Sequence, residues 1–287
     1  MEIFSQNFML AKKLIIILLA VVFAFPSSNA NAAGTLKTYT AVVAGKGRTY
    51  LVYQPTACAA KACPVLFMFH GLNGTADQVA KNYGWQETAD KNNFVAVFPE
   101  SLTIPQKDVK IGNWVVYSNY DAAGKHWDIA NISLPISQRY TTQDVEFVKT
   151  ILTDLPKNYK ILPTHVYATG HSYGAFFSYY VSMCLPDKIT AFASHSGGYT
   201  SYSMYSFPIP ARDAKSNAAY LMPGMILHSP KDTKIQYQWS LNLANEMKAK
   251  SQPYQFIQLA DAIAHNWDMT KNQTQWDFFK KNSPVLP

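Results

Sequence analysis

The sequence predicts an α/β fold with a mainly parallel central sheet and helices on both faces. Short runs of β-branched and aromatic residues recur along the chain, and such runs are typical of strands buried on both faces of a sheet. Between them lie longer segments with apolar residues three and four positions apart, which are typical of amphipathic helices. Strands that alternate with helices in this way predict parallel neighbours joined by crossover connections.

The expected elements follow one another in a regular order. Residues 38–53 alternate as two antiparallel strands would, with a turn near Gly45-Lys46-Gly47. Buried strands are expected at residues 65–69, 94–98 and 164–169, and further short strands at residues 189–194, 225–228 and 254–259. Helices are expected at residues 76–91, 144–155, 175–184, 241–250 and 274–281.

Two long segments, residues 100–142 and 197–223, lack a regular pattern and are rich in tyrosine and tryptophan. Loops of this length inside a compact domain are usually functional. Both are expected to leave the sheet at the carboxyl ends of strands, where open α/β sheets bind ligands. We expect three aromatic residues to contact the ligand, namely Trp114 and Tyr199 from these segments and Trp267 from a later loop.

The first 32 residues have the pattern of a secretory signal peptide. Two lysines precede an apolar run, residues 14–25, that is too short to span a bilayer. Ala30-Asn31-Ala32 then offers a small-residue cleavage site. We expect cleavage after Ala32, one domain over residues 33–287 without a stable membrane anchor, and a secreted location, extracellular or periplasmic. An uncleaved membrane anchor is the alternative.

The charge and the cysteines of the chain bear on its partners and on its disulfide bonds. The net charge is +7, or +6 without the signal peptide, which holds two lysines and one glutamate. The basic residues are dispersed rather than clustered, so no nucleic-acid partner is expected. Cys58 and Cys63 are the expected disulfide in an oxidising compartment, and Cys184 is expected to be a buried thiol. A bridge from Cys184 to either of the others remains open.

The residues Gly170-His171-Ser172-Tyr173-Gly174 form a G-x-S-x-G box between an expected strand and an expected helix. A serine on such a turn is the nucleophile elbow of an α/β-hydrolase. The two glycines have a steric reason, because backbone segments approach closely there and leave no room for a Cβ. Ser172 is therefore the expected nucleophile.

A serine nucleophile needs a general base and an acid that orients it. In α/β-hydrolases the chain order is serine, acid, histidine. His265 follows the last expected strand and is the candidate base. Asp232 follows the strand at residues 225–228 and is the candidate acid, with Asp213 and Asp261 as competitors.

The developing oxyanion needs backbone donors. The expected donors are the amides of Tyr173, which follows the nucleophile, and Leu72, in the loop after the strand at residues 65–69. His171 is expected to pack beneath the elbow, and His70 to support its own loop. No H-E-x-x-H motif or zinc-site cysteine spacing occurs, so neither a metal nor a cofactor is expected.

With the G-x-S-x-G box, the candidate acid and base and the loop around Leu72, the chain resembles a family of secreted esterases that includes feruloyl esterases and polyhydroxybutyrate depolymerases. The similarity covers nearly all of the mature chain in order, at residues 50–53, 64–74, 84–99, 144–148, 166–187, His228…Asp232 and His265-Asn266-Trp267. The resemblance implies an α/β-hydrolase fold and a serine esterase. It assigns nucleophile, acid and base to Ser172, Asp232 and His265, and the oxyanion amides to Leu72 and Tyr173.

The chain departs from that family's pattern in ways that bear on the substrate. Ser229 stands where the family often has glycine after the histidine, and Ile263 and Ala264 replace two frequent glycines before the base. The leading interpretation is a serine carboxylesterase that cleaves feruloyl esters, free or polymer-linked, through an acyl-enzyme. Alternatives are a poly(3-hydroxybutyrate) or oligomer depolymerase, an acetylxylan-type esterase and, from another class, a catalytically silent binding protein.

Overall fold

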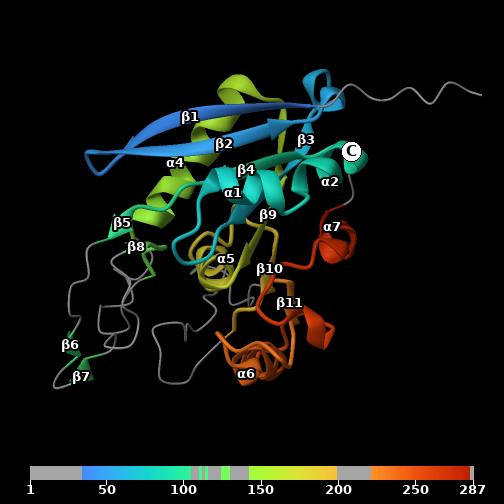
Figure 1. Ribbon diagram of the computed structural model, residues 1–287. Helices are drawn as coiled ribbons and strands as arrows, with labels where there is room; N and C mark the ends of the chain where they lie inside the picture. The colour runs from blue at the N-terminus through green and yellow to red at the C-terminus, as the bar shows by residue number, and fades with distance from the viewer. Residues whose placement is uncertain are drawn as a thin grey trace, which may run out of the picture. The chain divides into compact units, whose positions relative to one another are not determined.

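Eight strands form one sheet in the computed structural model, which describes residues 34–104, 110–111, 114–115, 124–129, 142–198 and 221–284 (Figure 1). In sheet order they are β1 (Thr35–Val43), β2 (Lys46–Gln54), β4 (Val95–Pro99), β3 (Cys63–Phe69), β9 (Ile161–His171), β10 (Ala191–His195), β11 (Gly224–His228) and β12 (Tyr254–Gln258). Strand β2 pairs antiparallel with β1 and β4, and all other neighbours in this sheet are parallel. The predicted α/β fold with a mainly parallel sheet is confirmed.

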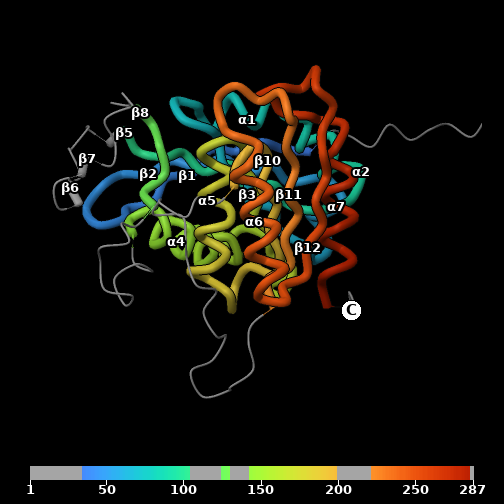
Figure 2. Tube along the Cα trace, turned by 90° about the horizontal axis from the view of Figure 1, so that it is seen from below, coloured from blue at the N-terminus to red at the C-terminus, as the bar shows by residue number. Residues whose placement is uncertain are grey.

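Six α-helices within the described residues cover the two faces of this sheet. They are α1 (Ala76–Asn82), α2 (Trp85–Asn92), α4 (Gln143–Asn158), α5 (Tyr173–Cys184), α6 (Tyr237–Ala249) and α7 (Asn272–Lys281). Helices α4, α5 and α6 pack on one face and follow one another across the sheet in that order (Figure 2). Helices α1, α2 and α7 pack on the other face.

Strand β3 shows why its sequence is apolar throughout. Val65, Phe67 and Phe69 belong to the core on the α5 side of the sheet. Leu66 and Met68 belong to the core on the opposite side. Because successive side chains of a strand point to opposite faces, a strand covered on both faces needs apolar residues at every position.

The helix expected at residues 76–91 is wrong as one helix, because it is broken between α1 and α2. Thr75 caps α1 by accepting a hydrogen bond from the backbone N–H of Gln78, 3.0 Å away. Gly84 then has a φ of 69°, a left-handed conformation that glycine adopts without strain. The break releases the carbonyl oxygen of Tyr83, which accepts hydrogen bonds from two residues near the C-terminus.

The long segments begin where they were expected to begin. Residues 100–142 follow the carboxyl end of β4, and residues 197–223 follow that of β10. Two short antiparallel pairs that the sequence did not predict lie in the first segment. They are β5 (Thr103–Ile104) with β8 (Gly124–Lys125), and β6 (Lys110–Ile111) with β7 (Trp114–Val115).

Cys58 and Cys63 form a disulfide that joins the short 3₁₀-helix at Thr56–Ala59 to the start of β3. The expected pairing is confirmed. Cys184 is free and partly buried, and burial raises the pKa of its thiol to about 12. Within the described ranges, no helix is long and apolar enough to cross a membrane.

The two glycines of the G-x-S-x-G box are required by packing. A Cβ on Gly174 would lie 2.2 Å from the carbonyl oxygen of Phe69, and a Cβ on Gly170 would lie 2.1 Å from that of Gly174. Both contacts are with backbone atoms, which cannot move aside without shifting β3 or α5.

Replacing Gly174 with alanine is therefore expected to destabilise the fold by about 3 kcal/mol or more, since overpacking in a core forces backbone shifts. The measurement is thermal unfolding followed by circular dichroism. Gly47→Ala is the matched control, because nothing lies within 4 Å of a Cβ added there. Equal melting temperatures for the two variants would contradict the packing argument.

Candidate active site

The turn at Ser172 joins the last residue of β9 to the first of α5. Ser172 has a φ of 56° and a ψ of −120°, which is a strained conformation for a residue with a side chain. Its backbone N–H donates to the carbonyl oxygen of His195 on the neighbouring strand, at 3.0 Å. The strained turn holds Ser172 at the carboxyl edge of the sheet, as the box predicted.

Ser172, His265 and Asp232 form one hydrogen-bonded chain, although they come from three separate connections of the fold. The Nε2 atom of His265 lies 2.9 Å from the Oγ atom of Ser172. Its Nδ1 atom lies 2.6 Å from the Oδ2 atom of Asp232. The side chain of Asp232 is fully buried, whereas that of His265 is 23% exposed.

The environment of Asp232 favours its charged form. Burial opposes ionisation and is the largest single influence, but hydrogen bonds outweigh it and lower the pKa of the carboxyl group. The donors that lower this pKa include His265 and the backbone N–H groups of Ile235 and Lys234, which lie 2.9 Å and 2.8 Å from Oδ1. Of the two competing aspartates, Asp261 is exposed on a 3₁₀-helix (Asp261–Ile263), and Asp213 lies outside the described residues.

The charge on Asp232 sets the proton arrangement of His265. A carboxylate only accepts hydrogen bonds, so Nδ1 of His265 carries a proton and donates it. Nε2 of the neutral ring is then an acceptor and can take the proton of the Ser172 hydroxyl. This arrangement can generate an alkoxide nucleophile and store its proton on the imidazole.

The loop after β3 lies beside the nucleophile. A Cβ added to Gly71 would lie 3.3 Å from the Cβ of Ser172, so Gly71 lies against the elbow. Leu72 is the next residue along this loop. Tyr173 is the first residue of α5, and backbone N–H groups at this end of a helix point out of its N-terminus. The two expected oxyanion donors thus lie on segments that meet at Ser172.

His70 supports that loop, as expected. Its Nε2 atom accepts a hydrogen bond from the backbone N–H of Ser101 at 3.1 Å, and its Nδ1 atom lies 2.7 Å from the carbonyl oxygen of Gly71. The indole Nε1–H of Trp127 donates to the carbonyl oxygen of His70 at 2.8 Å. The sequence offered no signal for this role of Trp127, which belongs to the irregular, aromatic-rich segment at residues 100–142.

His171 lies beneath the elbow and links it to the loop of the candidate base. Its Nε2 atom lies 2.9 Å from the backbone carbonyl oxygen of His265, and its Nδ1 atom lies 3.0 Å from the hydroxyl of Tyr83. Burial lowers the pKa of His171 to about 3, so the ring is neutral at the pH of ordinary assays. Nε2 therefore donates to the carbonyl, and Nδ1 accepts from Tyr83.

Replacing His171 with phenylalanine is expected to lower kcat about fivefold with little change in KM, because the lost hydrogen bond to the His265 loop is worth about 1 kcal/mol. Steady-state kinetics on a chromogenic ester would measure the change. Tyr83→Phe is the milder control, since it removes only the outer hydroxyl. The idea fails if the phenylalanine variant at position 171 keeps the wild-type kcat.

The structure locates one of the three aromatic residues selected as ligand contacts. Trp267 stacks on Tyr83 at 5.0 Å and on His195 at 4.5 Å between ring centroids. Its indole N–H lies 3.1 Å from both the carbonyl oxygen of Tyr83 and the Oδ1 atom of Asn272. These contacts assign Trp267 to the support of the base loop. The side chain of Trp114 and all of Tyr199 lie outside the described residues.

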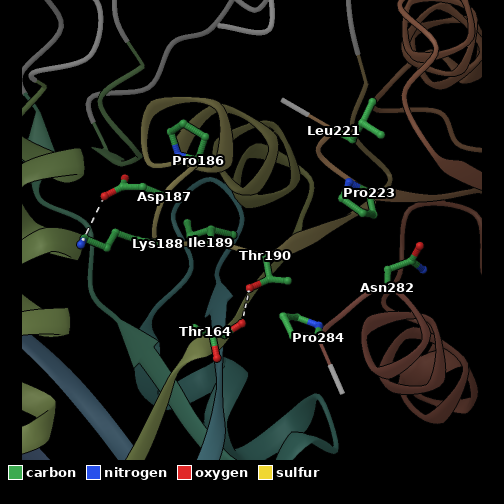
Figure 3. Close-up of a pocket in the computed structure, with 10 residues that line it drawn as sticks. All are labelled: Thr164, Pro186, Asp187, Lys188, Ile189, Thr190, Leu221, Pro223, Asn282 and Pro284. Carbon is green, nitrogen blue, oxygen red and sulfur yellow. Dashed lines mark hydrogen bonds and ion pairs between the residues drawn. The ribbon is translucent and has the colours of Figure 1, made fainter. Parts of the chain in front are cut away.

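A cavity of about 230 Å³ lies at the opposite end of the sheet (Figure 3). It is lined by Thr164 near the start of β9, by Thr190 before β10 and by Pro223 before β11. Because Ser172 follows the carboxyl end of β9, this cavity is separate from the hydrogen-bonded chain. Within the described part of the chain, no group of three or more His, Cys, Asp or Glu residues could hold a metal ion.

Residues 42–279 match the model of a protein family named Esterase, with the description "Putative esterase". The chain belongs to the Esterase family. One curated relative is the bifunctional acetylxylan esterase/xylanase XynS20E of Neocallimastix patriciarum, which is 27% identical over 194 residues. That match covers 68% of this chain and 23% of the relative, so the chain spans less than a quarter of the relative's length.

Solved structures share the α/β-hydrolase fold with this chain. A ferulic acid esterase from Anaeromyces mucronatus, in complex with ferulic acid, has a TM-score of 0.58 at 17% identity, covering 87% of this chain and 90% of that one. The acetyl xylan esterase from Aspergillus awamori has a TM-score of 0.61 at 13% identity, covering 86% and 100%. An S-formylglutathione hydrolase from Agrobacterium tumefaciens has a TM-score of 0.62 at 13% identity, covering 88% and 96%.

Proposed function

We propose that this esterase is a secreted serine carboxylesterase whose nucleophile, base and acid are Ser172, His265 and Asp232. The observation that carries the proposal is the hydrogen-bonded chain from Ser172 Oγ through His265 to the buried Asp232 carboxylate. That geometry supports proton transfer away from the serine hydroxyl. Membership of the Esterase family supports a carboxylic ester as the substrate.

The reaction proceeds in two halves. Ser172 Oγ attacks the ester carbonyl while His265 takes its proton, and the amides of Leu72 and Tyr173 stabilise the oxyanion. The alcohol then leaves with the proton from His265, and an acyl-enzyme remains on Ser172. Water, deprotonated by His265, attacks that acyl group, and collapse of the second tetrahedral intermediate releases the carboxylic acid and returns the proton to Ser172.

The acyl group that we propose is feruloyl or a related hydroxycinnamoyl group. The ferulic acid esterase with the same fold supports this substrate, and so do the aromatic residues of the two long segments, because aromatic rings stack on phenolic rings. Acetylated xylan is the second candidate, favoured by the acetylxylan esterase/xylanase relative and by the acetyl xylan esterase structure.

A product assay separates these substrates. Purified protein is offered methyl ferulate, acetylated xylan and a 3-hydroxybutyrate oligomer, and released acids are measured by chromatography, with Ser172→Ala as the control. Ferulate release that the variant lacks supports the proposal. Acetate or hydroxybutyrate as the main product would replace the substrate while retaining the mechanism.

Export is proposed from the signal-peptide pattern of residues 1–32 and is supported by the disulfide, since disulfides persist in oxidising compartments. The mass of the protein recovered outside the cytoplasm is expected to correspond to a chain that begins at Ala33. A chain that keeps residues 1–32 would contradict this part of the proposal.

A further inference from the structure

Asp232 is contacted by a second histidine that the reaction scheme does not use. His228 is the last residue of β11, and its Nε2 atom lies 3.1 Å from Oδ2 of Asp232. This is the same oxygen that His265 contacts at 2.6 Å. The side chain of His228 is fully buried, so water does not compete for the contact.

The surroundings of His228 place a proton on Nε2. That atom faces two acceptors, Oδ2 of Asp232 and the carbonyl oxygen of Ile235 at 3.2 Å. On the other side of the ring, Nδ1 lies 2.7 Å from the hydroxyl of Ser240. Burial lowers the pKa of His228, which favours the neutral ring. A neutral ring with its proton on Nε2 leaves Nδ1 to accept from Ser240.

Ser240 has a second acceptor within reach, the carbonyl oxygen of Gly197 at 2.9 Å. Its single hydroxyl proton serves either Nδ1 of His228 or that carbonyl. Donation to Nδ1 keeps the ring proton on Nε2, whereas donation to Gly197 would require the proton on Nδ1 and leave a bare Nε2 facing two oxygen acceptors. Because Oδ2 of Asp232 and the carbonyl oxygen of Ile235 both lie against Nε2, the first arrangement is favoured.

The other carboxylate oxygen is held independently. Oδ1 of Asp232 accepts the backbone N–H groups of Lys234 and Ile235, so the carboxylate keeps its orientation without His228. What His228 adds is a hydrogen bond to the oxygen that faces the base. A donor at that oxygen draws off part of the negative charge that would otherwise stabilise protonated His265.

We propose that His228 is a positioning residue that acts through Asp232: its Nε2–H shares Oδ2 with His265 and so keeps His265 unprotonated, and active as a base, to a lower pH. This inference rests on the proposed function. The titratable groups that face His228 and Asp232 from the neighbouring elements are His265, His171 on β9, His195 on β10 and Tyr237 on α6.

The test is the pH dependence of kcat/KM for wild type, His228→Leu and His228→Gln, followed on a methyl ester by acid release. Without a donor at Oδ2, the leucine variant is expected to move the acidic midpoint up by about half a pH unit. Its plateau at high pH is expected to stay within about threefold of wild type, because Oδ1 remains anchored. Glutamine can present an N–H at a similar position, so its midpoint is expected to match wild type.

A purely structural role would lower activity at every pH and leave the midpoint in place, and that result would overturn the inference. His165→Leu is the matched control, because His165 is also buried but bonds the carbonyl oxygen of Pro284, away from Asp232. Its acidic midpoint is expected to equal that of wild type.

A second readout needs no variant and covers the case in which His228→Leu does not fold. Nitrogen-15 spectra of labelled histidine in the wild-type protein report which ring nitrogen of His228 carries the proton. A proton on Nε2 supports the inference, and a bare Nε2 overturns it. If wild type neither hydrolyses esters nor reacts with a fluorophosphonate at Ser172, the proposed function fails, while these spectra still report on the bond to Asp232.

Discussion

Ser172→Ala is expected to lower kcat for ester hydrolysis by about 10⁴-fold or more, the largest effect of any single change in this chain. The hydroxyl oxygen is the atom that forms the acyl-enzyme, and no other described hydroxyl lies 2.9 Å from Nε2 of His265. Residual turnover is expected to come only from the oxyanion donors and substrate positioning. Steady-state kinetics with methyl ferulate and a 4-nitrophenyl ester would measure the loss.

The control for this change lies on the following helix. Ser182 is buried on α5, about three turns of helix after the elbow. Its hydroxyl donates to the carbonyl oxygen of Ser178. Ser182→Ala is expected to retain near wild-type kcat. Substantial hydrolysis by Ser172→Ala, at more than about a hundredth of the wild-type rate, would show that another group is the nucleophile.

Asp232→Asn is expected to lower kcat by about 10⁴-fold with the fold intact. An amide nitrogen at the position of Oδ2 would donate to Nδ1 of His265, which would shift the ring proton to Nε2. Nε2 would then point a proton at Ser172 and could not accept one. The melting temperature and the kcat of the variant would be measured together.

Asp261→Asn is the matched control, because Asp261 is the described competitor for the acid. Its side chain is exposed and it lies four residues before His265. The Asp261 variant is expected to keep wild-type kcat. The account would be contradicted if the Asp261 change inactivated the protein and the Asp232 change did not.

Much of the site could be predicted because the sequence carries local signals for it. The glycines around Ser172 indicate a close backbone approach, and the structure shows atoms of Phe69 and Gly174 where a Cβ would lie. Likewise, the order of serine, aspartate and histidine along alternating elements places all three at one edge of a parallel sheet. These are consequences of element order and steric size, which a sequence displays directly.

Other features depended on partners that are distant in sequence. The helix break at Gly84 is such a case, because the freed carbonyl oxygen of Tyr83 bonds Trp267 and Asn272 from the far end of the chain. The local pattern of residues 76–91 fits a continuous helix, and only the tertiary contact reveals why the chain turns. The contacts of Trp127 with His70 have the same origin.

The histidines illustrate the same limit. His171 lies in the G-x-S-x-G box and His228 lies four residues before Asp232, but the sequence assigned neither of them a hydrogen-bonding partner. Their roles appear only when the ring nitrogens are seen facing the carbonyl oxygen of His265 and the carboxylate of Asp232. Two of the three expected ligand contacts, Tyr199 and the side chain of Trp114, lie outside the described residues.

The most direct test of the central claim is labelling with a fluorophosphonate probe, followed by peptide mass spectrometry. The proposed mechanism predicts one adduct per chain on Ser172, formed at a rate that falls sharply in His265→Ala. Absence of labelling, or an adduct on another residue with Ser172 unmodified, would contradict the serine mechanism and favour a binding protein that retains the esterase fold.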